Sequence, residues 1–87
     1  MEIQTSLDWQ EIRSKLITIA DGTGIHARDM AKIVSNLDPM VAELSKEEIE
    51  CRRKGKQTNK HQELLKKFNE EIKNYEQMIT FGILLNG

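Results

Sequence analysis

Two apolar repeats, separated by a short break that contains a glycine, constrain the fold of this chain more than any other feature. In each repeat the steps alternate between three and four residues, the spacing of a helix that packs lengthwise on another helix. The first repeat comprises Ala27, Met30, Val34, Leu37, Val41, Leu44, Glu48 and Cys51. The second comprises His61, Leu65, Phe68, Ile72, Tyr75, Ile79 and Gly82. The chain is therefore predicted to contain two long helices whose apolar faces meet.

These repeats match each other in register when the chain folds back at Gly55 and Lys56. Facing residues of an antiparallel pair have numbers that add to a constant total. Six pairs have residue numbers whose totals agree to within one. They are Cys51 with His61, Leu44 with Phe68, Val41 with Ile72, Leu37 with Tyr75, Val34 with Ile79 and Met30 with Gly82. Glu48, which would face Leu65, is the one charged residue in the repeats. This match predicts an antiparallel αα-hairpin.

A third amphipathic segment precedes the first repeat. Asp8 and Glu11 have the form of a capping box, an oxygen acceptor followed by Glu three residues later. Apolar residues then form one stripe at helical spacing, namely Trp9, Ile12, Leu16, Ile19 and Ala20. Two glycines in residues 21–24 favour a turn and should end this helix. Residues 3–7 alternate as a strand would, but no other segment offers them a partner.

The patterns together predict an all-α chain, in which a short N-terminal helix packs on the long hairpin as a three-helix bundle. We expect one helical domain over residues 1–87, with a helix over about 8–20 and hairpin arms over about 26–54 and about 59–84. Gly55 should end the first arm in the left-handed conformation, and Asn59 with Gln62 should open the second. Pro39 should kink the first arm, or else split it with Asp38 as N-cap.

Composition narrows the functional classes. The 87 residues include 13 basic and 14 acidic side chains, so the chain lacks the positive surplus that drives non-specific nucleic-acid binding. The single cysteine, Cys51, excludes an internal disulfide and a cysteine zinc cluster. The first residues lack the basic start and apolar run of a signal peptide, and no stretch approaches the ~18 apolar residues of a membrane span. A cytoplasmic protein without a membrane span is expected.

No catalytic site, cofactor or metal site is predicted. His26 and His61 fall at opposite ends of the hairpin. Cys51 would lie near His61, a nucleophile–base pairing in principle, but no third group orients them and a half-buried structural cysteine is favoured. The glycines of residues 21–24 lack the lysine and the preceding strand of a phosphate-binding loop. We therefore expect a protein that is not an enzyme.

Residues 17–34, ITIADGTGIHARDMAKIV, resemble the helix-turn-helix of phage repressors. The resemblance rests on Ala20, on Gly24 four residues later, and on Ile25, Met30 and Ile33 at core positions. It implies a small DNA-binding regulator, whose second helix would read bases through residues near its start. These residues are His26, Ala27, Arg28 and Asp29. A simple helix–loop–helix corner is the favoured interpretation, and the regulator is kept as the alternative function.

Basic residues also gather at the predicted hairpin tip. Under the alternative function, the nucleic-acid contacts would be His26, Arg28, Lys32, Arg52, Arg53 and Lys56. No aromatic side chain interleaves at the tip for base stacking. Basic side chains at a helix C-terminus are also what the helix dipole favours. A nucleic acid is therefore not the favoured partner.

The sequence finishes in MITFGILLNG, residues 78–87, which is apolar around most of a helix. The second repeat uses Ile79 and Gly82. The remaining apolar side chains therefore face away from the first arm, and another surface must shield them from solvent. The first helix spans under half the length of an arm and should cover only part of them. The expected protein interface comprises Trp9, Met78, Phe81, Ile83, Leu84 and Leu85.

These observations favour a protein–protein interaction or assembly module, of the adaptor, chaperone or inhibitor type. The expected partner is a protein, most simply a second copy, in a dimer or larger oligomer. The layout, a tryptophan near the start and a helical hairpin behind it, is similar to the small needle and chaperone proteins of type III secretion. Many phage assembly proteins share this layout, so it assigns no family.

Overall fold

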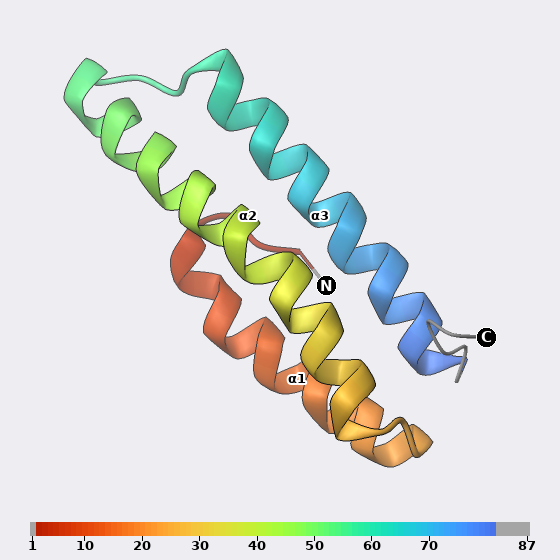
Figure 1. Cartoon of the computed structure of the whole chain (residues 1–87). Helices are drawn as coiled ribbons and strands as arrows, with labels where there is room; N and C mark the ends of the chain where they lie inside the picture. The colour runs from red at the N-terminus through yellow and green to blue at the C-terminus, as the bar shows by residue number, and fades with distance from the viewer. Residues whose placement is uncertain (1, 82–87) are drawn as a thin grey trace.

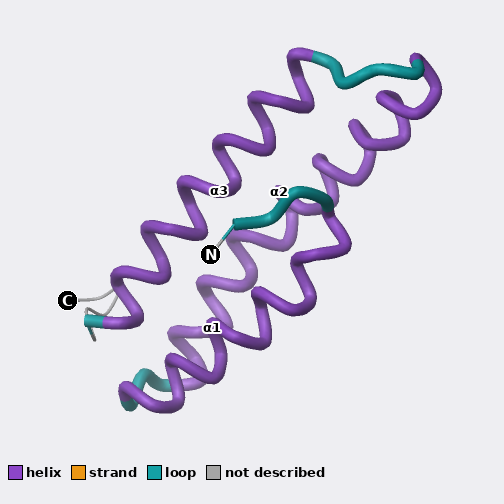
Figure 2. The backbone as a smooth tube through the Cα atoms, turned by 180° about the vertical axis from the view of Figure 1, so that it is seen from behind, coloured by secondary structure: helices purple, strands orange, loops and turns teal. Residues whose placement is uncertain are grey.

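Three helices, lying side by side along one long axis, make up the structure (Figure 1). A computed structural model of the chain describes residues 2–81, in a body of 45 × 18 × 18 Å. A 3₁₀ turn η1 (Ser6–Asp8) leads into α1 (Trp9–Thr23), followed by α2 (Ala27–Lys54) and α3 (Asn59–Thr80). α2 and α3 form the antiparallel hairpin, and α1 lies against both of them (Figures 1 and 2). The predicted all-α bundle is confirmed.

The core follows the predicted repeats. The buried apolar repeat residues are Met30, Val34, Leu37, Leu44, Phe68, Ile72 and Ile79. The same cluster also contains Trp9, Ile12, Leu16 and Ala20 of α1, together with Ile3, Ile25 and Ile33. Val41, Leu65 and Tyr75 are half-buried against it. The Asn36 carboxamide donates to the Tyr75 hydroxyl at 3.2 Å, so Tyr75 lies beside the turn of α2 that holds Leu37, its predicted partner.

Both helix C-termini end on a left-handed glycine. Gly55 has φ 71°, and its neighbour's N–H donates to the Cys51 carbonyl, which satisfies a carbonyl that the helix leaves free. Gly24 has φ 76° and closes α1 in the same way, with Ile25 N–H bonded to the Ala20 carbonyl at 3.0 Å. α1 therefore continues through Gly22 to Thr23, three residues beyond the predicted end.

The N-cap of α1 is Asp8, as predicted, whereas that of α3 is shifted by one residue. Asp8 precedes α1 but makes no side-chain cap there, because its carboxylate turns back toward the N-terminus. α3 is capped by Thr58 rather than Asn59, and the Thr58 hydroxyl accepts the N–H of His61 at 3.1 Å. Thr58 has the extended backbone of a cap residue, whereas Asn59 is already helical.

Pro39 lies inside one continuous helix. α2 runs from Ala27 to Lys54, so the alternative of two helices is wrong, and a kink at Pro39 stays a prediction. The Asp38 carboxylate does not cap a helix. It accepts the indole N–H of Trp9 at 2.8 Å and thereby ties α1 to α2.

Residues 2–8, here called the strap, cross from α3 to α2 before α1 begins (Figures 1 and 2). Ile3 is 1% exposed and belongs to the core cluster. The strand-like alternation seen in the sequence thus corresponds to a bent segment that ends in η1 and is held partly by helix side chains. No helix of the described residues combines the length and apolarity that crossing a membrane requires.

Candidate functional site

The end of α3 presents the most exposed aromatic side chain of the described region. Phe81, the C-cap residue, is 75% exposed, while Ile79 beside it is buried and Met78 is half-buried. Ile83, Leu84 and Leu85, also predicted to lie in the interface, are outside the described residues. The exposed aromatic ring therefore lies at the junction between the bundle and the apolar terminal sequence.

Trp9, which was predicted to lie in the interface, is buried within the bundle in this structure. Its side chain is 4% exposed and meets the Phe68 ring edge-on, with centroids 5.4 Å apart and planes at 78°. This geometry places the positive edge of one ring against the negative face of the other. Trp9 anchors α1 and the strap to the hairpin instead.

A hollow of about 420 Å³ opens between α1 and α2 near the turn that joins them. Its apolar lining includes Ile17, Ile25, Met30 and Val34. α2 begins where α3 finishes, so this hollow lies toward the same end of the bundle as Phe81 (Figure 1). That end therefore combines an exposed aromatic side chain with an open apolar depression.

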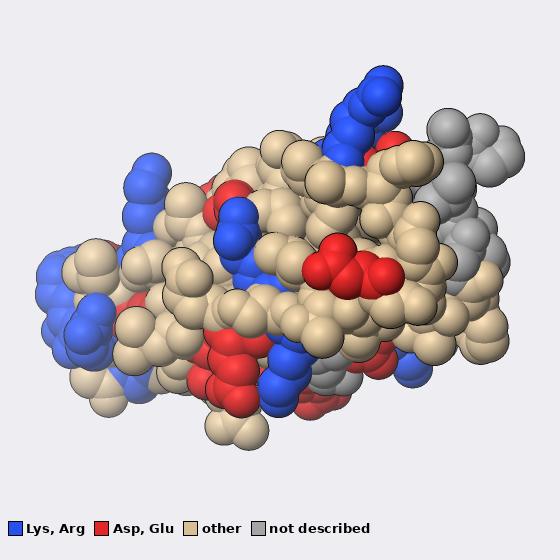
Figure 3. All heavy atoms as spheres, turned by 90° about the horizontal axis from the view of Figure 1, so that it is seen from below, with Lys and Arg blue, Asp and Glu red and all other residues tan. Residues whose placement is uncertain are grey.

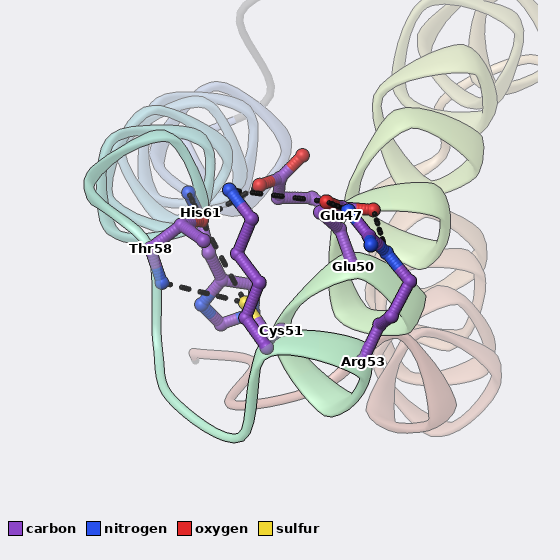
Figure 4. A network of polar contacts seen from close by, with 7 residues as sticks. Glu47, Glu50, Cys51, Arg53, Thr58 and His61 are labelled. Carbon is purple, nitrogen blue, oxygen red and sulfur yellow. Dashed lines mark hydrogen bonds and ion pairs between the residues drawn. The ribbon is translucent and has the colours of Figure 1, made fainter.

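At the opposite end, a polar network closes the hairpin (Figure 4). The Thr58 hydroxyl donates to Glu47 Oε1 at 2.6 Å and lies 3.7 Å from Cys51 Sγ. The backbone N–H of Thr58 also donates to Cys51 Sγ at 3.5 Å.

The His61 side chain hydrogen-bonds to Gln57. Its Nδ1 lies 2.8 Å from the Gln57 carboxamide nitrogen, which can only donate, so Nδ1 is the acceptor of that bond. Cys51 is half-buried, as favoured from the sequence, and the network caps α3 and fixes the turn. Among residues 2–81, no group of three or more His, Cys, Asp and Glu side chains could hold a metal ion.

The predicted nucleic-acid contacts divide into two distant groups. Arg52, Arg53 and Lys56 are exposed at the hairpin tip, where basic side chains gather at one end of the molecule (Figure 3). Glu50 binds both Arg53 and Lys54, and the hydrogen bond from Arg53 lowers the pKa of Glu50 and raises that of Arg53. Part of the positive charge at the tip is thus paired.

His26, Arg28 and Lys32 are exposed at the other end, where α1 turns into α2. These two helices run side by side in opposite directions (Figures 1 and 2), whereas the helices of a helix-turn-helix cross at roughly 90–120°. This arrangement matches the simple corner rather than the repressor motif, and it forms no single basic face from the six predicted residues.

The sequence analysis missed the side chains that hold the strap. Asn69 of α3 accepts the N–H of Ile3 at 2.7 Å and donates to its carbonyl at 3.0 Å. Glu48 of α2 accepts the N–H and the hydroxyl of Ser6 at 2.7 and 2.6 Å. The one signal in the sequence was Glu48 itself, a carboxylate that interrupts an apolar repeat.

Comparison with known proteins gives no assignment, because no protein-family model, curated protein or solved structure matches the chain.

Acid should weaken the turn at the start of α1 through Asp8. The backbone N–H groups of Gln4 and Thr5 donate to its carboxylate at 2.9 and 3.2 Å, and the pKa of Asp8 is lowered by these bonds, that from Gln4 first. The bonds favour the charged form, so their contribution is complete above the ordinary value of 3.8 and is lost as pH falls below it.

We therefore expect Asp8→Asn to be less stable than wild type at about pH 6, with the difference shrinking at about pH 2.5. Urea unfolding of both proteins at the two pH values measures this. Asp21→Asn, which removes an exposed carboxylate from the far end of α1, is the control for net charge. An equal deficit for Asp8→Asn at both pH values would contradict the electrostatic explanation.

Proposed function

We propose that this chain is a non-enzymatic protein–protein interaction or assembly module, which acts in the cytoplasm and associates with a second copy of itself. The surface that we assign to this function is the C-terminal end of the hairpin. The proposal assigns no cofactor, and the chain would act as an adaptor, chaperone or inhibitor through binding alone. Nucleic acid has no role in it, since the basic residues lie at two separate ends.

The exposure of Phe81 carries this proposal. A large aromatic side chain that is 75% exposed at the start of an apolar terminal sequence is the kind of surface that protein interfaces cover. In a twofold dimer, the interface would bury the Phe81 side chain of each copy. At roughly 1.5–3 kcal/mol for a buried Phe side chain, one pair supplies roughly 3–6 kcal/mol before the cost of association.

Self-association should therefore depend on concentration and on Phe81. Light scattering over a wide range of concentrations is expected to show a dimer or larger species for wild type, and a monomer for Phe81→Asp. The substitution removes the apolar ring and places two like charges against each other in a symmetric contact. Circular dichroism should show the same helix content for both proteins, because Phe81 follows the last residue of α3.

Ile49→Asp is the matched control. Ile49 is 58% exposed and lies near the hairpin tip, away from the proposed interface. We expect this variant to associate as wild type does. A wild-type protein that stays monomeric throughout, or equal loss of association in both variants, would contradict the proposal.

A further inference from the structure

The hollow between α1 and α2 has an apolar floor and small side chains at its rim. Three of the residues that line it, Ile25, Met30 and Val34, are 8%, 5% and 7% exposed and belong to the core cluster. Ala27 and Ala31, at the start of α2, are exposed and line it as well. Because alanine has no side-chain atom beyond Cβ, these two residues leave the depression unfilled. Its volume of about 420 Å³ lies within the range of about 300–1,000 Å³ that is typical of binding pockets.

The sequence that follows α3 supplies apolar side chains of matching character. Phe81 is followed by Gly82 and then by Ile83, Leu84 and Leu85, here called the tail. Apolar side chains are stabilised when another apolar surface takes them out of water. The hollow lies toward the same end of the bundle as Phe81 (Figure 1), so the tail is attached at the end where the hollow opens.

The tail is too short to fill the hollow of its own chain. Among residues 2–81, the hollow is lined by α1, α2 and the turn between them, and α1 and α3 flank α2 (Figure 1). A tail leaving α3 would have to cross the roughly 8–10 Å between neighbouring helix axes and then pass α2, which is about 10–12 Å wide. Even a fully extended chain places Ile83 at most about 7 Å and Leu85 at most about 14 Å from Phe81. The tail of a second copy approaches from outside and has no such limit.

The area that a stable dimer needs also exceeds what Phe81 supplies. A specific interface buries about 800 Å² on each partner, whereas one Phe side chain buries about 150–250 Å². The tail and the hollow add apolar area at the same end of the molecule. In a twofold dimer, the tail of each copy would enter the hollow of the other, so this contact would form twice.

We propose that the hollow receives the tail of a second copy, and that two chains exchange tails around their Phe81 side chains. This inference rests on the proposed self-association and adds to it the surface that receives the C-terminal residues. The apolar side chains of the tail cover Ile25, Met30 and Val34 at the floor of the hollow. The hollow is therefore shielded from water in the dimer and open to it in the monomer.

Variants of the hollow and of the tail, compared by sedimentation equilibrium of the full chain, test this exchange. Ala31→Glu places a carboxylate at the rim of the hollow, and Leu84→Asp places one in the tail. Each should raise the dissociation constant of the dimer at least about tenfold, because the contact would bury a charge without a partner. Ala42→Glu is the matched control, since Ala42 is an exposed alanine about 16 Å farther along the same helix. This variant should dimerise as wild type does.

An equimolar mixture of the Ala31→Glu and Leu84→Asp chains separates tail exchange from any other use of the tail. The first chain keeps an intact tail and the second keeps an intact hollow, so one of the two contacts can form between them. Native mass spectrometry, which distinguishes the three dimers by mass, should therefore show more heterodimer than random pairing gives. The heterodimer should also persist at concentrations where each variant alone is monomeric.

The outcomes distinguish this exchange from the proposed function. A wild-type chain that stays monomeric throughout would contradict the self-association and, with it, the exchange. A wild-type dimer that Phe81→Asp dissociates and Ala31→Glu leaves intact would overturn the exchange alone. A mixture without an excess of heterodimer would do the same, since it is the result expected if the tail contacts its own chain or another tail. Should circular dichroism show that Ala31→Glu is unfolded, Ala27→Glu, which alters another exposed alanine of the hollow, takes its place in both experiments.

Discussion

Trp9→Ala should cost about 3–5 kcal/mol of the free energy of unfolding, the range for truncating a buried Trp or Phe. The indole is 4% exposed, packs edge-on against Phe68, and donates its N–H to Asp38. It is also the first residue of α1, directly after the strap, so its loss loosens three elements at once. Chemical denaturation of the variant and wild type measures the effect, which is a large part of the 5–15 kcal/mol typical of a domain.

Two further variants separate the causes of this loss. Leu7→Ala removes a side chain of similar apolar character two residues earlier, but Leu7 is 85% exposed, so we expect a change within about 0.5 kcal/mol. Trp9→Phe keeps a ring against Phe68 and loses the bond to Asp38, so it should fall between wild type and Trp9→Ala. Equal costs for Leu7→Ala and Trp9→Ala would show that Trp9 is not an anchor of the bundle.

The hairpin was predictable because its information is periodic and local. Each repeat places apolar residues on one helix face, and the match in register across Gly55 leaves one antiparallel arrangement that buries both faces. Gly55 adds a second local signal, since a glycine after a helix favours the left-handed cap. The structure shows that cap at φ 71°.

Helix ends were less predictable because several residues nearby compete for the same role. Thr58 and Asn59 both carry oxygen acceptors suited to an N-cap, and only the extended backbone of Thr58 decides between them. Gly22 lowers helix stability by about 1 kcal/mol relative to Ala, but the turn containing it is stabilised by burial of Ala20, so α1 continues to Thr23.

The strap and the position of Trp9 could not be read from the sequence. The bonds that hold the strap join residues 42 and 66 positions apart, and each pairs a backbone group with a helix side chain. Such contacts leave no periodic pattern. For the same reason, the apolar surface of Trp9 could not be distinguished from that of Phe81: both occur in apolar segments, and only the folded chain shows that the first is covered and the second exposed.

Replacing Pro39 with Ala should stabilise the protein by about 2 kcal/mol, or roughly 10 °C in Tm. Proline in a helix interior is about 3 kcal/mol less favourable than Ala, since it lacks an N–H and its ring crowds the carbonyl four residues earlier, here that of Ser35. Part of the gain is offset, because proline also restricts the unfolded chain by roughly 0.4–1 kcal/mol. Both Pro39 and Ser35 are exposed, so the substitution removes no core packing.

A third variant tests whether the gain comes from helical backbone geometry. Pro39→Gly also restores the N–H but adds backbone freedom, so it should be about 1 kcal/mol less stable than Pro39→Ala. Ser35→Ala, with a change within about 0.5 kcal/mol, controls for a new alanine on the same face of α2. No gain from Pro39→Ala would contradict the prediction and would show that α2 must bend at this residue for its two halves to pack on α1 and α3. The full gain of about 2 kcal/mol would show instead that α2 can be straight at this residue. The destabilisation by Pro39 would then come only from its missing N–H and the contact of its ring with the Ser35 carbonyl.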